Sequence, residues 1–223
     1  MAHDLIDSTE MYLRTVLELE EEGIPALRAR LSERLGLSAP SISEGVVRLE
    51  AQGLLHLSDD RVVELTAQGR VRAEQVMRKH RLAERLLVDV LGLEHEHVHE
   101  EACRWEHVIS DRVEQRLVEF LGNPTTSPYG NPIPGSGEGF DHIVPLAEVV
   151  AGEVLLHSIS EHLQADADVM HILHEHGMIA GERAEVATRG DQVELTLAGH
   201  AFALGAEAAR YVYVIPSESA VTA

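Results

Sequence analysis

Cysteine is nearly absent from this chain of 223 residues, which contains Cys103 and no other. An intramolecular disulfide is therefore excluded, and the cysteine content does not point to an oxidising compartment. Aromatic residues make up only 4% of the chain, and no apolar run approaches the length of a membrane-spanning helix. The first residues are acidic where a secretory signal would be basic and then apolar, so we expect a cytoplasmic protein.

Basic residues are scarce as well. The chain has 18 Lys and Arg against 38 Asp and Glu, which gives a formal net charge of −20. Contacts with nucleic-acid phosphates need a basic surface, so this balance taken alone argues against a nucleic-acid partner. A DNA-binding function would have to find its positive charge locally, and added cations would favour it. The apolar share of 44% is enough to fill the cores of one large domain or two small ones.

Residues 4–65 combine three helical patterns with a hairpin pattern. Apolar residues at helical spacing predict helices over 4–22, 26–35 and 39–52. Two short apolar runs around a polar turn then predict a hairpin over 54–65. This order is typical of a winged helix-turn-helix, whose third helix enters the major groove of DNA. Winged helices also serve as protein-interaction modules, and the pattern by itself leaves that alternative open.

The winged-helix prediction indicates which side chains would contact DNA. Short polar groups at the start of the third helix allow close approach to phosphates and to thymine methyl groups. Arginines near the motif supply positive charge, and one in the hairpin could reach the DNA backbone. The candidate DNA contacts are Arg28, Ser38, Pro40, Ser41, Ser43, Glu44, Arg48 and Arg61.

The rest of the chain changes from helical to β patterns across a linker. Helices are predicted over 67–91, 95–105 and 106–121, and residues 123–139 contain 4 Pro and 4 Gly, which is a linker composition. Beyond the linker, strand patterns predominate and favour a small barrel-like domain in an α+β protein. The strand patterns lie near 153–160, 183–188, 192–197 and 210–215, and one helical pattern lies near 166–176.

Side chains that ligate metals occur at helical spacing in residues 103–107, where two predicted helices meet. Cys103, Glu106 and His107 are spaced i, i+3 and i+4, so a helix would project all three from one face. A thiolate, a carboxylate and an imidazole together form a mixed site for a borderline divalent metal. The alternative is an ordinary solvated helix face, and the presence of the thiol favours the metal site slightly.

A second group of possible ligands is weaker. His80 and Glu84 form an i, i+4 pair on the predicted long helix, and His99 lies one turn before Cys103, so the three could serve a neighbouring site. For His80 and Glu84 alone, a surface ion pair is the favoured interpretation. We interpret the remaining scattered histidines as surface residues.

Several unusual strings in the sequence resemble those of one protein family. They closely resemble segments of the diphtheria-toxin-repressor family of iron-dependent regulators, especially its actinobacterial members. The resemblance spans nearly all of residues 4–135 and is looser in the C-terminal part. The strings are TEMYLRT (9–15), LRAR (27–30), VMRKHRLAERLL (76–87), VHEEACRWEHV (98–108), SPYGNPIPG (127–135) and SEHLQAD (160–166).

The resemblance implies a repressor of three domains, which we place at residues 1–73, 74–140 and 141–223. They would be a winged helix-turn-helix DNA-binding domain, a helical dimerisation and metal-binding domain with the Pro/Gly linker, and an SH3-like β-barrel domain. The resemblance also implies a homodimer that binds palindromic double-stranded DNA operators of iron-uptake and siderophore genes, with two dimers on an operator as one arrangement. It implies no enzymatic activity and no membrane partner.

The resemblance further implies two Fe(II) sites per subunit, with Co(II), Ni(II), Zn(II), Mn(II) or Cd(II) as substitutes. The primary, activating site would use Met11, Cys103, Glu106 and His107. The ancillary site would use His80, Glu84, His99, Glu161 and Gln164, the last two from the SH3-like domain. The residues that match the family's anion-binding positions are Arg81, Ser127 and Asn131.

These assignments imply a mechanism. A metal shared by Met11 and Cys103 would pin the N-terminal helix and favour the DNA-competent spacing of two recognition helices. Soft sulfur ligands favour iron over manganese. The nearest alternative function is a manganese-dependent regulator of the same fold, and a metalloenzyme is a more distant alternative. Glu44 replaces the glutamine that close relatives carry, which changes the expected operator preference but not DNA binding as such.

Overall fold

The computed structural model describes residues 8–137, 139 and 142–222, and these fall into two compact units. Unit 1 comprises the chain up to residue 80 together with 103–116, and unit 2 comprises 81–102 and the chain from 117 onward. The first four residues of the helix predicted over 4–22 lie outside the described residues. In the part of the chain that is described, no helix is both long and apolar enough to cross a membrane.

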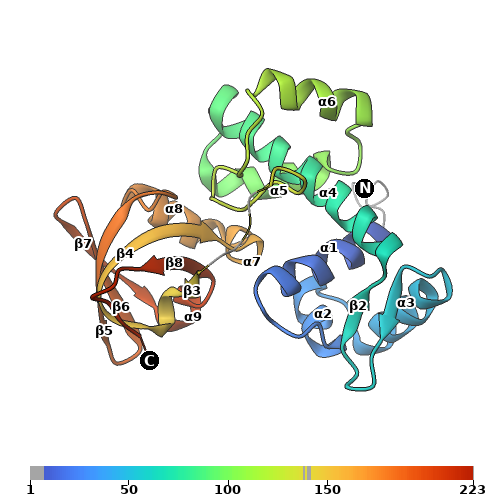
Figure 1. Cartoon of the computed structure of the whole chain (residues 1–223), viewed down its shortest axis with the longest axis horizontal. Helices are drawn as coiled ribbons and strands as arrows, with labels where there is room; N and C mark the ends of the chain where they lie inside the picture. The colour runs from blue at the N-terminus through green and yellow to red at the C-terminus, as the bar shows by residue number, and fades with distance from the viewer. Residues whose placement is uncertain (1–7, 138, 140–141, 223) are drawn as a thin grey trace. The chain divides into compact units, whose positions relative to one another are not determined.

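Unit 1 contains a winged helix-turn-helix, drawn from blue to cyan in Figure 1. α2 packs against α1 and α3, and β1 pairs antiparallel with β2, with Leu55 opposite Leu65. The core between them is apolar, and Leu13, Leu31 and Ile42 are completely buried in it. The elements are α1 (Ser8–Glu21), α2 (Arg28–Leu35), α3 (Ala39–Ala51), β1 (Leu55–Leu57) and β2 (Val63–Leu65).

Local signals set the ends of these helices. Gly36 adopts a left-handed φ of 63° and ends α2, and the Ser38 hydroxyl accepts from the Ser41 amide at 3.3 Å and caps α3. A glycine just after a helix and a serine just before one are both local signals of helix ends. α2 begins two residues later than predicted because Leu27 forms a β-bridge with Val62 at the hairpin.

Three further helices follow the hairpin. They are α4 (Ala67–Arg85), which continues as a π-helical turn η2 (Leu86–Val90), then α5 (His95–Trp105) and α6 (Asp111–Phe120). Thr66 caps α4, because the Gly69 amide donates to the Thr66 hydroxyl at 3.1 Å. The helix predicted over 106–121 was wrong at its start, since α6 begins at Asp111. The Trp105 carbonyl accepts from the amides of residues 108 and 109, which turns the chain between the two helices.

The C-terminal part of unit 2 is an antiparallel sheet with short helices (Figure 1). The strand order is β3-β8-β4-β5-β6-β7, and β9 also pairs with β4. The strands are β3 (Val144–Pro145), β4 (Val149–Ile159), β5 (Arg183–Arg189), β6 (Gln192–Leu197), β7 (His200–Gly205), β8 (Val212–Pro216) and β9 (Val221–Thr222). The helices are η3 (Leu146–Glu148), α7 (Glu161–Gln164), α8 (Ala167–Glu175) and α9 (Ala206–Ala209).

This arrangement confirms the predicted α+β class with a winged helix, a helical middle part and an SH3-like sheet domain. Sequence patterns missed the two-residue strands β3 and β9, the strand β7 and the four-residue helices α7 and α9. β7 is rich in Ala and Gly, so the ladder with β6 rather than β-propensity makes it a strand. α7 depends on one cap, in which the Ser160 hydroxyl accepts from the Leu163 amide at 3.3 Å.

A stacked histidine pair in unit 2 predicts acid sensitivity. His95 of α5 stacks on His174 of α8 with ring centroids 4.0 Å apart. Burial first, and then the charge of His174, lower the pKa of His95. The unfolded chain therefore binds more protons than the folded one just below about pH 6.5, and the stability that neutral His95 contributes is lost as the pH falls. We expect His95→Phe to reduce the drop in melting temperature between about pH 7.5 and 5.5 by a few degrees, measured with a chelator present.

The matched control for this prediction is His200→Gln, because His200 is an exposed residue of β7. That variant should keep the pH dependence of the parent protein. If the melting curves of His95→Phe shift with pH as steeply as those of the parent, the stacked pair does not contribute to acid sensitivity.

Candidate metal centre

Three residues of unit 1 bring metal-ligating atoms together, and we call them the Cys103 cluster: His80, Cys103 and Glu106. One ligand atom from each lies within 4.8 Å of the others. His80 comes from α4, Cys103 from α5, and Glu106 from the turn that follows α5. His80 Nδ1 lies 2.6 Å from Glu106 Oε2, and both side chains are fully buried.

A buried arginine on α1 joins the Cys103 cluster. The Arg14 Nη1 donates to Cys103 Sγ at 3.1 Å and to Glu106 Oε2 at 2.7 Å, and its Nε donates to Glu18 Oε1 at 2.6 Å. Burial by itself would raise the pKa of the Glu106 carboxyl, but the Arg14 and His80 side chains outweigh it and hold the pKa below its usual range. Glu106 is therefore a buried carboxylate, a state in which it can ligate a cation.

His107 lies beside the Cys103 cluster, in the turn between α5 and α6 rather than on a helix. Its Nδ1 lies 2.7 Å from Glu10 Oε2 of α1, whereas its Nε2 is buried without a hydrogen bond, 3.2 Å from Glu106 Oε1. Burial opposes protonation, but Glu10 and Glu106 outweigh it, so the pKa of His107 is raised. The Glu10 contact fixes the ring and points Nε2 away from Glu10, which is the arrangement of histidines in carboxylate–histidine–metal sites.

Met11 is the fourth residue that the sequence assigned to this site. It is half-buried on α1, three residues before Arg14, so both side chains leave the same side of the helix. The donor set of thioether, thiol, carboxylate and imidazole suits a borderline divalent metal such as iron, and the unbonded Nε2 of His107 fits a ligand role.

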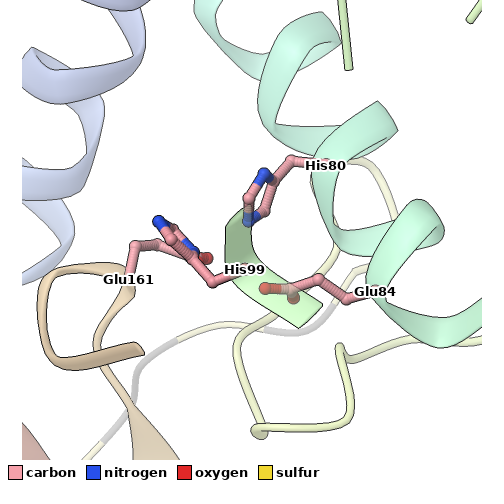
Figure 2. Close-up of side chains that lie close together, drawn as sticks. All are labelled: His80, Glu84, His99 and Glu161. Atoms are coloured by element: carbon pink, nitrogen blue, oxygen red, sulfur yellow. The ribbon is translucent and has the colours of Figure 1, made fainter. Parts of the chain in front are cut away.

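A second group of ligand atoms lies in unit 2, and we call it the Glu84 cluster: Glu84, His99 and Glu161. One ligand atom from each lies within 4.8 Å of the others. Figure 2 shows these side chains, with Glu84 on α4, His99 on α5 and Glu161 on α7. His80 leaves α4 one turn before Glu84. Gln164, also on α7, has a buried Oε1 without a hydrogen bond, while its Nε2 donates to the Ile159 carbonyl at 2.8 Å.

The three predicted anion-binding residues are buried in unit 2 and bond to protein groups. The Arg81 Nε donates to Glu161 Oε1 at 2.9 Å and its Nη1 donates to the Pro132 carbonyl. The Ser127 hydroxyl accepts from the Tyr129 amide at 3.2 Å, and Asn131 Nδ2 donates to the Ile159 carbonyl at 2.8 Å. Arg81 therefore connects the Glu84 cluster to the Pro/Gly segment.

The predicted DNA contacts gather on the helix-turn-helix of unit 1. Ser38, Pro40, Ser41, Glu44 and Arg48 are exposed, and Ser43 and Arg28 are half-buried. Val47 adds an exposed apolar side chain on the same helix, with 57% of its surface accessible. Arg61 is exposed in the hairpin turn, where it adopts a left-handed φ of 64°.

Sequence reasoning missed Arg14 and Glu10 as members of the site. Both lie within one turn of Met11 on α1, which is the signal that could have drawn attention to them. Their partners are 89 to 97 positions away in the sequence, and no local pattern indicates such a contact.

Comparisons with known proteins agree with this architecture. Residues 4–63 match the family description "Iron dependent repressor, N-terminal DNA binding domain", and residues 66–135 match "Iron dependent repressor, metal binding and dimerisation domain". The chain is 51% identical over 211 residues to the iron-dependent repressor IdeR of Mycobacterium bovis, with 89% of this chain and 92% of the relative covered. It is 48% identical over 205 residues to the diphtheria toxin repressor of Corynebacterium glutamicum, covering 86% and 89%.

Among solved structures, one titled "Manganese-dependent transcriptional repressor complex with manganese" is similar, with a TM-score of 0.81 at 30% identity, covering 94% of this chain and 100% of that one. A winged helix joined to a helical part with clustered ligand side chains defines a metal-responsive DNA-binding regulator as the class of protein. Within that class, this chain belongs to the iron-dependent repressor family, which includes the diphtheria toxin repressor.

Proposed function

We propose that this protein is an Fe(II)-dependent transcriptional repressor of the bacterial cytoplasm that binds palindromic operators of iron-uptake and siderophore genes as a homodimer. The observation that carries the proposal is the convergence of Cys103, Glu106 and His107 with α1 inside the same compact unit as the winged helix. The mycobacterial relatives named as iron-dependent repressors, to which the chain is 50–51% identical, support the choice of metal.

The primary site consists of Met11, Cys103, Glu106 and His107. Two sulfur atoms among four ligands favour iron, cobalt, nickel or zinc over manganese. Affinity alone would rank zinc above ferrous iron, so selection for iron in the cell rests on availability and on geometry. Co(II), Ni(II), Zn(II) and Cd(II) are therefore expected to activate the protein in vitro.

The ancillary site consists of Glu84, His99, Glu161 and Gln164, together with His80. His80 is included because the family resemblance assigns it to this site. Arg81, Ser127 and Asn131 form the neighbouring anion site, in which Arg81 would exchange its bond to Glu161 for the anion. The result is two metal sites per subunit.

The chain's own residues provide the coupling to DNA. A bound divalent ion supplies two positive charges and one bond to each ligand. Met11 and Glu10 on α1 and His107 in the turn after α5 are then held in one arrangement, and α1 packs on the DNA-binding helices. This narrows the range of recognition-helix positions, and because coupling is reciprocal, operator DNA tightens metal binding equally.

The dimer surface lies on and before α6. Val108, Val113 and Phe120 have 60%, 48% and 68% of their surfaces exposed, which is unusual for apolar residues in a water-facing helix. A two-fold symmetric partner would cover them and set the separation of the two α3 helices. Two dimers on one operator are compatible with this arrangement.

The DNA contacts are those of the helix-turn-helix and the hairpin, namely Arg28, Ser38, Pro40, Ser41, Ser43, Glu44, Arg48 and Arg61. Because of the net charge of −20, we expect DNA binding to depend on bound cations and the affinity for non-specific DNA to be low. The Glu44 carboxylate can accept a hydrogen bond from a cytosine amino group, which would give this repressor its own operator preference.

The test is anaerobic DNA binding measured by fluorescence anisotropy. Because Glu44 affects the operator, the duplex is first selected from genomic fragments retained by the Fe(II)-loaded protein. We expect binding at a lower free concentration of iron than of manganese, and no binding with a chelator. Binding at a lower manganese concentration would favour the second candidate, a manganese-dependent repressor, which the manganese-bound structure at 30% identity supports. Retention of no fragment with either metal would contradict DNA binding.

A further inference from the structure

A guanidinium group occupies the centre of the Cys103 cluster. Arg14 has 4% of its surface exposed, and its Nη1 atom donates both to Cys103 Sγ and to the two carboxylate oxygens of Glu106, at 3.1, 3.0 and 2.7 Å. Cys103 and Glu106 are two of the four residues proposed to hold the activating metal. The Nη1 atom of Arg14 therefore bonds to the lone pairs of Cys103 and Glu106 that a metal ion would need.

We infer that Arg14 is an internal cation that substitutes for the metal in the primary site, and that it sets the metal concentration needed for activation. The inference rests on the proposed function. In the absence of metal, Arg14 satisfies the ligands, and it has to leave Cys103 and Glu106 before both can bind a divalent ion.

The electrostatics of Glu106 require such a cation. Its side chain is completely buried, and a buried carboxylate without a positive partner is strongly destabilised. His80 contributes a contact through Nδ1, but Arg14 is always charged, and its Nη1 contacts both carboxylate oxygens of Glu106. A divalent ion at the same ligands would repel the guanidinium at close range, so the two cations compete for Glu106.

Arg14 also has a second partner that would hold it when it leaves. The Arg14 Nε donates to Glu18 Oε1, one turn further along α1, and this bond involves neither Cys103 nor Glu106. A rotation of the terminal guanidinium can release the metal ligands while the bond to Glu18 remains. Arg14, Glu18 and Met11 all belong to α1, so release of the arginine changes the charge contacts of the helix that the metal is proposed to fix.

Removing Arg14 should change the metal affinity in the direction opposite to that expected for a residue that only supports the ligands. If Arg14 only oriented Cys103 and Glu106, its removal would weaken metal binding. If Arg14 competes with the metal, its removal tightens binding. A single nearby opposite charge changes the proton affinity of a carboxylate by 10-fold or more, so we expect Arg14→Met to tighten metal binding by about 10-fold.

The matched control is Arg34→Met. Arg34 forms a similarly buried ion pair with Glu22 in the same unit, with side-chain exposures of 6% and 5%, and that pair involves no residue of the Cys103 cluster. The loss of a buried arginine is therefore the same in both variants, but only Arg14 contacts proposed metal ligands.

The experiment is an anaerobic titration of the full-length chain with Co(II) at about pH 8, where carboxylates are ionised. Binding at Cys103 is followed by the thiolate-to-cobalt charge-transfer absorption, and melting temperatures are measured with chelator and with saturating Co(II). We expect Arg14→Met to bind cobalt about 10-fold more tightly than the parent, and Arg34→Met to bind within about twofold of it. The metal-free Arg14→Met protein should melt lower than the parent, and the gain in melting temperature on adding cobalt should be larger.

Equal or weaker cobalt binding by Arg14→Met would overturn the inference. If that variant does not fold, Arg14→Lys is the test. A single ammonium group cannot bond Glu18, Glu106 and Cys103 at once. The Arg14→Lys variant should therefore bind cobalt more tightly than the parent by a smaller factor of about three. A parent protein without the charge-transfer absorption would instead contradict the proposed primary site. If the parent shows that absorption and Arg14→Met binds cobalt with the parent's affinity, the role of Arg14 is contradicted and the proposed primary site is not.

Discussion

Replacing Cys103 with alanine is expected to abolish metal-dependent DNA binding at the iron concentration that just saturates the parent protein. Cys103 supplies the one thiolate of the primary site, and its Sγ lies within 4.8 Å of ligand atoms of His80 and Glu106. Losing a ligand of this kind weakens a mixed sulfur, nitrogen and oxygen site by at least about 100-fold, because no other side chain replaces the bond. Anaerobic fluorescence anisotropy on the selected operator duplex measures the effect.

The conservative variant Cys103→Ser separates ligation from packing. Serine keeps the size of the side chain but offers a harder oxygen atom, so we expect weak iron activation and a relative gain for manganese. Cys103 is only half-buried, so both variants should melt close to the parent when a chelator is present. Met11→Ala tests the role of α1 in the same assay. If either Cys103→Ala or Met11→Ala retains the parent's iron dependence, metal at this site does not control DNA binding.

Replacing Gly130 with alanine is expected to destabilise the protein by about 3 kcal/mol, the largest effect on folding that we predict. Gly130 has a left-handed φ of 84°, where an L side chain costs about 1–2 kcal/mol. A Cβ atom at this position would also lie 1.9 Å from the His157 carbonyl oxygen of β4, so backbone must move, at a cost of about 1–3 kcal/mol. For a chain of this size we expect the melting temperature to fall by about 6–12 °C.

The control for this prediction is Gly122→Ala. Gly122 has a similar φ of 77°, but in the described part of the chain no atom beyond its sequence neighbours lies within 4 Å of the position of the added Cβ. Its cost should be the conformational part alone, about 1 kcal/mol. Equal melting temperatures for the two variants would show that close packing against His157 does not matter. Because Gly130 lies between Ser127 and Asn131, the same variant should also disturb the proposed anion site.

Short-range chemistry explains which features could be predicted. Gly36 ends α2 through its left-handed φ, and Ser38 and Thr66 begin helices through hydrogen bonds to amides three positions away, so their roles follow from the sequence. Weak local signals explain the failures. β7 is a strand because β6 pairs with it, and α6 begins at Asp111 because the chain turns after Trp105.

The sequence by itself determined the winged-helix pattern, the linker and the residue types that ligate metal, since these depend on periodicity and on short strings. Only the tertiary structure decided how the ligands are held. Arg14 reaches Cys103 and Glu106 from 89 and 92 positions away, and Glu10 orients a histidine that lies in a turn instead of on a helix. Contacts over such separations depend on how α1, α4 and α5 pack, and packing depends on all the side chains of the core at once.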